Sequence, residues 1–250
     1  MPIILVNNHL VSENEPQFAL QNSGLLSGEG LLETIRARNG KIEFLSDHLQ
    51  RLRKGAKYFR IKLPALPEEK LIKILLQKNN LDREIARLRI MLTRCNTVVT
   101  VQKYLPLPSA NYRQGVKLIT ARHPLNGKIA EYKTLFRLPY IQLNQQAKTR
   151  KCYDTLLLDK TGNLLETTTA NIFLLRENKL YIPRKENRLA GIMEKNIIKH
   201  GKKLGYTIAS RNININQLSS TDKIFITNSL VGALPVKKID QLNISFMLHN

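Results

Sequence analysis

The sequence predicts an α+β protein with two domains. Its 250 residues suffice for one large domain or for two domains of about 100 to 150 residues each. Stretches with strand periodicity and stretches with helical periodicity are mixed in both halves of the chain. Residues 105–115, LPLPSANYRQG, gather prolines, small polar residues and a glycine between two strand-like stretches. We therefore predict a first domain over residues 1–110 and a second over residues 111–250.

Two β-hairpins are predicted at the start of the first domain. The stretch PIILVNNHLVS turns at Asn7-Asn8, and GLLETIRARNGKIEFL turns at Asn39-Gly40. An Asn-Gly pair favours a type I′ turn, because both of its central positions need a positive φ. The strands on either side of each turn should therefore pair with each other.

Two helices and two further strands complete the predicted first domain. Ser46 is the expected N-cap of a helix over DHLQRLRKGAKYF, and Pro67 is expected to open a second helix, EEKLIKILLQK. The stretch IARLRIML alternates, and TVVTVQKY is rich in β-branched residues, so both are predicted strands. The first domain is therefore predicted to be α+β.

The second domain is predicted to mix strands and helices in the α/β manner. The expected helices cover residues 138–149 and the stretch IMEKNIIKHGKKL. The expected strands are VKLITAR, DTLLLD, NIFLLR, KLYIP and two more near residues 206–211 and 223–227. The turn KTGN is expected between DTLLLD and the next strand.

The composition indicates a folded, soluble protein. Hydrophobic residues make up 42% of the chain and charged residues 24%, with no low-complexity tract. No stretch approaches the roughly 18 apolar residues of a membrane span, and the amino terminus lacks the marks of a secretion signal. Cys95 and Cys152 lie neither in a CxxC motif nor at zinc-ligand spacing. We therefore predict a cytoplasmic protein without a membrane segment, a disulfide or a metal site.

The net charge of +21 is the unusual bulk property of the chain. Such a charge raises nucleic acid or another polyanion as a partner. The 40 Lys and Arg residues are nevertheless spread along the whole chain, and the densest segment, 36–62, carries no RNP-type aromatic pattern, zinc finger or basic zipper. Dedicated nucleic-acid binding is therefore not favoured, although a basic polyanion-binding protein stays open as an alternative.

Lys133 is the first candidate for chemistry. It stands in AEYKTLFRLPY among apolar and aromatic residues, and burial among such groups favours the neutral amine that a covalent role requires. Glu166, in GNLLETTTANIFLL, is a carboxylate among hydroxyls at a strand end. A lysine for a Schiff base and an acid for a pyridinium nitrogen are what pyridoxal phosphate requires of a protein. An exposed helix-start lysine and a solvent-facing strand glutamate are the alternatives.

Three further features could bind a phosphate group. Gly191 stands at the start of the helix in RLAGIMEKNIIKH, whose free backbone N–H groups attract anions. Asn228 and Ser229 end a strand in FITNSLVGALPV and supply small donors. Arg51, in DHLQRL, offers a planar fork that suits a phosphate.

Taken in this order, these features resemble the fold-type IV pyridoxal-phosphate enzymes: branched-chain aminotransferases, D-amino acid aminotransferases and 4-amino-4-deoxychorismate lyase. Besides Lys133, the resemblance is carried by GEGLLETIRARNGKIEFLSDHLQRL, DTLLLDKTGNLLETTTANIFLL, LAGIMEKN and TNSLVGALPV, and it covers nearly the whole chain. It implies a carboxyl-terminal pseudo-barrel domain larger than the amino-terminal domain. It also implies a homodimer, with an active site between the domains that the neighbouring subunit partly closes.

The resemblance also assigns roles to individual residues. It makes Lys133 the Schiff-base lysine and general acid/base, and Glu166 the partner of the pyridine nitrogen. It assigns the cofactor's phosphate to a set drawn from the three features above: Arg51, the backbone of Ile192 and Met193, and the turn at Asn228 and Ser229.

Within the family, the sequence resembles the lyase more than the aminotransferases. Aminotransferases of this type usually have a threonine where Met193 stands and often a tyrosine where Leu138 stands, a place that Tyr140 could fill. The stretch NSLVGALPV is also more similar to the lyase. We therefore expect conversion of 4-amino-4-deoxychorismate to 4-aminobenzoate and pyruvate, with a branched-chain or D-amino acid aminotransferase as the alternative.

Cationic groups are expected near the cofactor, because the lyase substrate carries two carboxylates. Arg36 and Arg94 are the candidates, since both lie near strand positions that the family directs toward its site. Thr34 and Thr168 could supply hydroxyl groups there. The alternative for each arginine is an ordinary exposed side chain on a basic protein.

Overall fold

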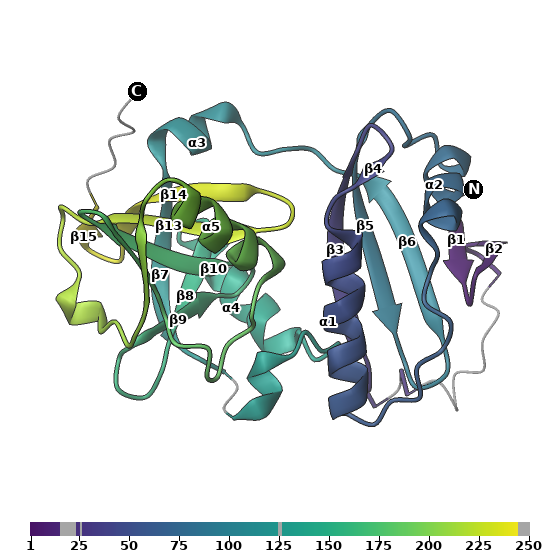
Figure 1. Ribbon diagram of the computed structural model, residues 1–250, viewed down its shortest axis with the longest axis horizontal. Helices are drawn as coiled ribbons and strands as arrows, with labels where there is room; N and C mark the ends of the chain where they lie inside the picture. Colours follow the sequence, from purple (N-terminus) through teal and green to yellow (C-terminus); the bar gives the residue numbers. More distant parts are fainter. Residues whose placement is uncertain (16–23, 26, 125–126, 245–250) are drawn as a thin grey trace. The chain divides into compact units, whose positions relative to one another are not determined.

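A computed structural model describes residues 1–15, 24–25, 27–124 and 127–244 of the chain. The chain divides into two compact units (Figure 1). The first unit comprises Met1–Pro106 together with Lys133–Phe136, and the second comprises Leu107–Tyr132 together with Arg137–Asn250. The α+β class and the two-unit organisation predicted from the sequence are confirmed.

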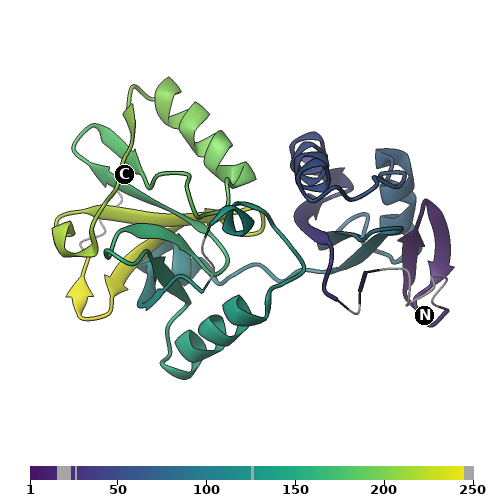
Figure 2. The same ribbon diagram turned by 90° about the horizontal axis from the view of Figure 1, so that it is seen from below.

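The first unit contains a six-stranded sheet with the order β2-β1-β6-β5-β3-β4. Its strands are β1 (Ile3–Val6), β2 (His9–Ser12), β3 (Leu31–Arg38), β4 (Lys41–Ile42), β5 (Ile85–Leu92) and β6 (Thr97–Lys103). Helices α1 (Leu45–Tyr58) and α2 (Glu69–Lys78) lie on the same face of this sheet (Figure 2). Leucine and isoleucine side chains of both helices and of the central strands form one buried cluster there.

Both predicted hairpin turns are confirmed. Asn7 and Asn8 have φ values of 49° and 68°, and Asn39 and Gly40 have φ values of 48° and 72°. These are the positive φ values that a type I′ turn needs at both central positions.

The predicted N-cap of α1 is wrong. The helix begins at Leu45, so that Ser46 lies inside its first turn, and the N-cap is Phe44 in the left-handed conformation with φ 55°. A phenylalanine with positive φ is uncommon, and the preference for serine at N-caps therefore pointed to the wrong residue. Pro67 precedes α2 as predicted, but the helix itself starts at Glu69, with Glu68 as its N-cap.

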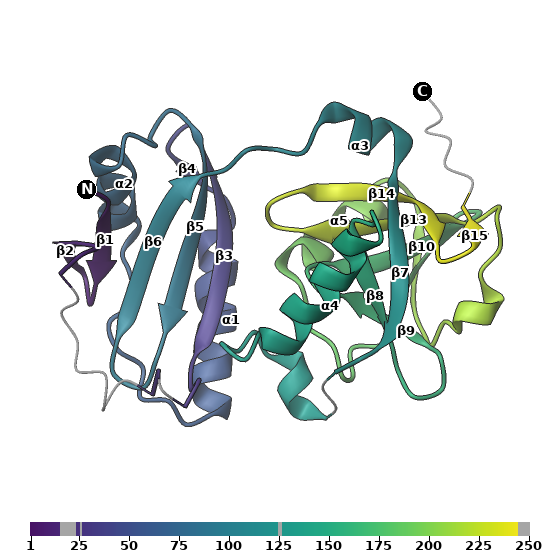
Figure 3. The same cartoon turned by 180° about the vertical axis from the view of Figure 1, so that it is seen from behind.

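Strand β3 divides its side chains between the two faces of the sheet. Glu33, Ile35 and Ala37 are buried on the face that α1 and α2 cover, as alternation along a strand requires. Thr34 and Arg36 therefore lie on the opposite face, which Figure 3 shows with α1 behind the sheet.

The second unit is built on a closed six-stranded barrel. Strands β10, β13, β14, β7, β8 and β9 pair in that order, and a pairing of Asn171 on β10 with Glu166 on β9 closes the ring. The barrel strands are β7 (Val116–Arg122), β8 (Asp154–Leu158), β9 (Leu164–Thr167), β10 (Asn171–Arg176), β13 (Lys223–Asn228) and β14 (Gly232–Ile239). Each of them contributes residues to one buried apolar cluster, which is the filling expected inside a small barrel. The barrel-type second domain is thereby confirmed.

The remaining elements extend or cover the barrel. Strands β11 (Lys179–Ile182), β12 (Thr207–Ser210) and β15 (Leu242–Asn243) lengthen the sheet. Helices α4 (Leu138–Thr149) and α5 (Ile192–Lys203) match the predicted helices, and short helical turns occur as α3 (Ser109–Gln114), η2 (Lys128–Glu131) and η3 (Ile215–Gln217). Among the described residues, no helix is long and apolar enough to cross a membrane.

Candidate active site

Lys133 lies in a short segment that pairs with the beginning of β3. The Lys133 carbonyl accepts from the Leu32 backbone N–H at 2.8 Å, and Thr134 forms an antiparallel bridge with Leu31. The segment can come so close because Gly30 has no side chain, since a Cβ at that position would lie 2.6 Å from Leu135 Cδ1. Lys133 is half-buried and lies outside α4, so it is not the exposed helix-start lysine of the alternative interpretation.

Arg51 is bound by a buried glutamate within the same unit. Its Nε and Nη2 atoms donate to the two carboxylate oxygens of Glu33 at 2.8 and 2.6 Å. His48 Nδ1 lies 2.6 Å from Glu33 Oε2. Burial lowers the pKa of His48, so its imidazole is neutral at pH 7 and donates its Nδ1–H to the carboxylate.

The ionised Glu33 carboxylate is expected to stabilise the fold in a way that is lost in acid. Burial by itself would raise its pKa, but the charge and hydrogen bonds of Arg51, with the hydrogen bond of His48, lower it from 4.5 to about 2. Because the folded-state pKa is depressed, the stabilisation is complete above pH 4.5 and is lost as the pH falls toward 2. We expect Glu33→Gln to lower the free energy of unfolding by about 3 kcal/mol at pH 6.

Urea denaturation of wild type and Glu33→Gln at several pH values between 6 and 2 measures this contribution. The difference between the two proteins should shrink as the pH falls through this range. A difference that stays constant down to pH 2 would show that the Glu33 charge is not its source.

A β-bulge sets the direction of Glu166 on β9. Leu157 on β8 pairs with Glu166 whereas Leu158 pairs with Leu164, so one step on β8 spans two steps on β9. The extra residue breaks the alternation, and Glu166 does not follow Leu164 into the barrel core. It shares a face with its other partner, Asn171, instead.

The carboxylate of Glu166 is buried among polar groups of the second unit. It accepts from the Leu189 backbone N–H at 3.2 Å, and its other oxygen lies 3.7 Å from His123 Nε2. The Tyr140 hydroxyl lies 3.4 Å from the same His123 nitrogen, and the Arg137 guanidinium lies 4.1 Å from the centre of the Tyr140 ring. Burial, followed by the negative charge of Glu166, raises the pKa of Tyr140, so this phenol stays neutral. Sequence reasoning missed His123 and Arg137.

Leu138 and Tyr140 differ in their surroundings. Leu138 occupies the position where related aminotransferases often have tyrosine, and it is 61% exposed. Tyr140 is buried in the polar group around Glu166, two residues further along α4.

A second buried carboxylate organises the threonines that follow Glu166. Asp154, which is fully buried, accepts hydrogen bonds from the hydroxyl groups of Thr167, Thr168 and Thr169. It also accepts from the Thr169 backbone N–H and from Asn144 Nδ2. The Thr168 hydroxyl is therefore engaged with Asp154 in this structure.

Asp154→Asn is expected to lower the free energy of unfolding by about 2 to 4 kcal/mol. The amide replaces one of the two oxygens that accept from hydroxyl groups with a donor, which leaves buried donors facing each other. Urea denaturation measures the loss. Asp159→Asn is the matched control, because Asp159 accepts from Thr161 and Asn163 in an exposed turn. Equal losses of unfolding free energy in the two variants would show that the buried network around Asp154 stabilises the fold no more than the exposed turn around Asp159 does.

The amino-terminal end of α5 is a suitable place for an anion. Gly191 is its N-cap and provides no side-chain hydrogen bond to the first turn, where the backbone N–H groups of Ile192 and Met193 lie. A Cβ at position 191 would overlap with Asn171 Oδ1, so any other residue there would force the Asn171 side chain to move. The same Asn171 donates through Nδ2 to the Leu189 carbonyl at 2.8 Å.

Arg188 fixes the loop before α5, and sequence reasoning missed it. It is 1% exposed and donates to Glu194 Oε2 at 2.5 Å and to the carbonyls of Pro183 and Arg184. Glu194 lies in the first turn of α5. This loop therefore connects the α5 terminus to Leu189, which contacts Glu166.

The turn after β13 is held by the side chain of Asn228. Its Oδ1 accepts from the backbone N–H groups of Leu230 and Val231 at 2.9 and 3.0 Å, and its Nδ2 donates to the Thr169 carbonyl. Ser229 is the next residue in this turn. The two predicted residues thus lie beside the threonine turn that Asp154 organises.

The predicted substrate residues lie in the first unit. Arg36 forms an ion pair with Glu43 at 2.8 Å, on the same face of β3 as Thr34. Arg94 forms a 2.8 Å ion pair with Glu29 and is 64% exposed. Arg36 and Thr34 are thus located on one sheet face, whereas Arg94 lies beyond the end of β5.

Arg87 is an additional cationic candidate on that face. It is opposite Arg36 in the β3–β5 ladder. Its Nε is buried and has no hydrogen-bond partner among the described residues. Burial, followed by the charge of Arg89, lowers the pKa of Arg87, so a bound anion would relieve an unfavourable environment.

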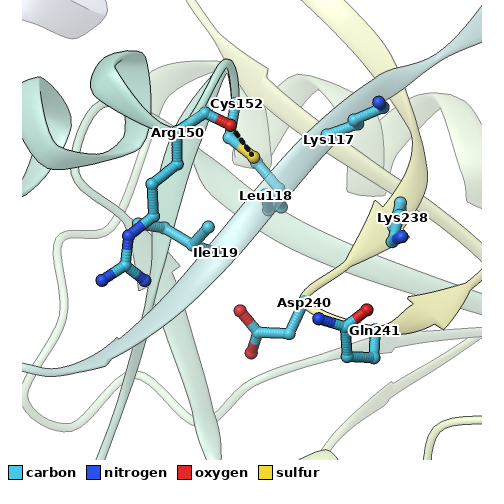
Figure 4. Close-up of a pocket in the computed structure, with 8 residues that line it drawn as sticks. All are labelled: Lys117, Leu118, Ile119, Arg150, Cys152, Lys238, Asp240 and Gln241. Carbon is cyan, nitrogen blue, oxygen red and sulfur yellow. Dashed lines mark hydrogen bonds between the residues drawn. The ribbon is translucent and has the colours of Figure 1, made fainter.

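A surface pocket of the second unit lies apart from these groups (Figure 4). Its lining comes from β7, from the loop after α4, from the end of β14 and from the turn that follows β14, and none of the predicted site residues belongs to it. The lining residues are Lys117, Leu118, Ile119, Arg150, Cys152, Lys238, Asp240 and Gln241.

The sequence of the chain is similar to those of known aminotransferases. The family model described as "Amino-transferase class IV" matches residues 30–239. A protein of Methanocaldococcus jannaschii, provisionally named branched-chain-amino-acid aminotransferase, is 29% identical over 95% of this chain and 88% of its own. A D-alanine aminotransferase of Listeria monocytogenes is 23% identical over 97% of this chain and 89% of its own.

Solved structures of similar fold include one provisionally named 4-amino-4-deoxychorismate lyase. It superposes with a TM-score of 0.77 and 27% identity, and the match covers 89% of each chain.

Proposed function

We propose that this chain, which belongs to the amino-transferase class IV family, is a lyase that converts 4-amino-4-deoxychorismate to 4-aminobenzoate and pyruvate in folate biosynthesis. Enzymes of this family depend on pyridoxal 5'-phosphate, which is the cofactor of this chain. The observation that carries the lyase proposal is the stretch NSLVGALPV, whose turn Asn228 holds beside Thr169. The 27% identity to a solved structure provisionally named as this lyase supports it.

The residues of the chain fit the cofactor. The first turn of α5 presents backbone N–H groups after Gly191, where a Cβ would meet Asn171 Oδ1. Such a helix start is a suitable binding place for a phosphate. Glu166 is a buried carboxylate that accepts from a backbone N–H and has further capacity as an acceptor. We propose that Arg51, Ile192, Met193, Asn228 and Ser229 bind the phosphate.

Lys133 is proposed as the point of attachment and as the base. When bound, the cofactor supplies an electron sink that accepts negative charge from the substrate carbon. The Lys133 amine removes the proton from the carbon that bears the substrate amino group. Glu166 keeps a proton at the ring nitrogen, while the Leu189 N–H and His123 orient its carboxylate. The substrate's C–O bond to the enolpyruvyl group would then break, and the substrate ring would become aromatic. The released enolpyruvate would take up a proton, which balances the one that Lys133 removes, to become pyruvate.

The face of the first sheet opposite α1 and α2 is proposed to bind the substrate carboxylates. Arg36 and Thr34 on this face are predicted for this role, and so is Arg94, which lies beyond the end of β5. Arg87 joins them because its buried Nε needs a hydrogen-bond acceptor. A carboxylate is the acceptor that matches a guanidinium best.

An aminotransferase is the second candidate. The named relatives from M. jannaschii and L. monocytogenes favour it. Met193 and the exposed Leu138 depart from the aminotransferase pattern and favour the lyase. Both reactions would use Lys133 and Glu166 in the same roles.

Substrate assays with the purified holoenzyme separate the candidates. The lyase should release pyruvate from 4-amino-4-deoxychorismate, measured with lactate dehydrogenase and NADH. Transfer of amino groups from leucine or D-alanine to 2-oxoglutarate, without pyruvate release, would instead establish the aminotransferase. Protein that cannot be loaded with cofactor, and so shows no visible absorption band, would favour the basic polyanion-binding protein. The homodimer and the cytoplasmic location stay predictions.

A further inference from the structure

We infer that Glu33 and His48 are positioning residues that hold the Arg51 guanidinium for the phosphate group of the cofactor. This inference rests on the proposed function, because it takes Arg51 as a phosphate ligand. Neither Glu33 nor His48 carries a role in the sequence-based assignment of the site.

The first observation is the geometry of the ion pair. The Glu33 carboxylate binds Arg51 along one edge of the guanidinium, through Nε and Nη2. Two parallel hydrogen bonds fix both the position and the plane of the fork, whereas a single contact would let it rotate. The Glu33 carboxylate thus accepts from two of the five N–H donors of the guanidinium.

The second observation is an asymmetry of burial. The Glu33 side chain is 1% exposed and the His48 side chain is fully buried, but the Arg51 side chain is 15% exposed. The carboxylate therefore lies behind the guanidinium, on the protein side. The Arg188–Glu194 pair differs, because both of its side chains are at most 4% exposed and the arginine is surrounded by loop carbonyls.

The third observation is the place of Glu33 in the chain. It follows Leu32, whose backbone N–H donates to the Lys133 carbonyl. Burial raises the pKa of Glu33, whereas the charge and hydrogen bond of Arg51, the hydrogen bond of His48 and, least of all, the Lys133 charge lower it. Strand β3 thus binds the Lys133 backbone through Leu32 and carries Glu33, which binds Arg51.

His48 completes the arrangement. Its neutral imidazole donates to the same Glu33 oxygen that accepts from Arg51 Nη2. This donor holds the carboxylate in place without adding a second positive charge that would compete with Arg51. The network therefore orients Arg51 before any ligand binds, which reduces the entropy lost on binding.

The test compares two probes that differ only in the phosphate, pyridoxal 5'-phosphate and pyridoxal. Their Kd values are measured by absorbance titration of cofactor-free wild type and Glu33→Gln, and trapping on Lys133 with borohydride serves as the second readout. We expect Glu33→Gln to weaken binding of pyridoxal 5'-phosphate about tenfold, with pyridoxal changed less than about twofold. The ³¹P resonance of the bound cofactor should also shift.

A double-mutant cycle tests whether Glu33 acts through Arg51. When Arg51→Gln is already present, adding Glu33→Gln should raise the Kd of pyridoxal 5'-phosphate by less than about twofold. Glu84→Gln is the matched control, since Glu84 pairs with Lys103 on an exposed part of the same unit, and it should bind both probes as wild type does. Should Glu33→Gln fail to fold, His48→Gln leaves the ion pair intact and should show a smaller loss confined to the phosphorylated probe.

Two results overturn the inference alone. One is a Glu33→Gln variant that binds both probes as wild type does, and the other is equal weakening of both probes. Wild type that binds no pyridoxal 5'-phosphate overturns the inference together with the proposed function.

Discussion

Lys133→Ala is expected to abolish covalent attachment of the cofactor and to lower the rate of pyruvate formation by roughly 10⁴-fold or more. Alanine provides neither the amine that attaches the cofactor nor the base that removes the substrate proton. The segment around Lys133 is held to β3 by backbone hydrogen bonds, so the substitution should leave the fold intact.

Visible absorption, and mass spectrometry after borohydride treatment, measure this outcome. Wild type should be yellow and should gain the mass of the reduced cofactor on the peptide that contains Lys133. Lys128→Ala is the matched control, because Lys128 lies five residues earlier and pairs with Glu131 at the surface. Pyruvate formation at the wild-type rate by Lys133→Ala would refute the proposed chemistry, as would cofactor found on another lysine.

Local sequence patterns predicted most elements of this fold. The turns at Asn7-Asn8 and Asn39-Gly40, and the helix over residues 138–149, depend on interactions between neighbours in the chain. Such short-range preferences can be predicted from a single sequence. Lys133 and Glu166 were found in another way, because they stand in motifs that a known family shares.

The contacts that hold the predicted site residues in place could not be predicted from local patterns or from family motifs. Glu33 and Arg51 meet because a strand and a helix pack together, and Asp154 meets Thr168 across a barrel ladder. The bulge before Glu166 depends on the pairing register of β8 and β9, which periodicity alone does not reveal. These contacts join residues distant in the sequence, so Glu33 and Asp154, the partners of the predicted Arg51 and Thr168, looked like ordinary charged side chains.

Part of the high positive charge of the chain is concentrated on one face of the first sheet, where arginines cluster. Alternation along β3 and β5 places Arg36 and Arg38 on the same face as Arg87 and Arg89. Arg36 has Glu43 as a partner, but the Arg87 Nε is unsatisfied among the described residues. Like charges at this spacing repel each other, and a dianionic substrate would reduce that repulsion.

Glu166→Gln is expected to retain cofactor binding but to lower kcat by roughly 10²- to 10⁴-fold. The amide has nearly the same shape as the carboxylate and can still accept from the Leu189 N–H. It has no negative charge, however, and therefore cannot keep a proton on the ring nitrogen, which weakens the electron sink. The loss should appear in kcat much more than in the Kd of the cofactor.

Steady-state kinetics and absorbance titration distinguish these two effects. Glu186→Gln is the control, since Glu186 is an exposed residue of the loop before α5 and should change neither quantity. Glu166→Asp keeps the charge but shortens the side chain, so its kcat should lie between those of wild type and Glu166→Gln. A Glu166→Gln enzyme that turns over at the wild-type rate would mean that the ring nitrogen is served by another group, and His123, 3.7 Å from Glu166, would be the first residue to replace.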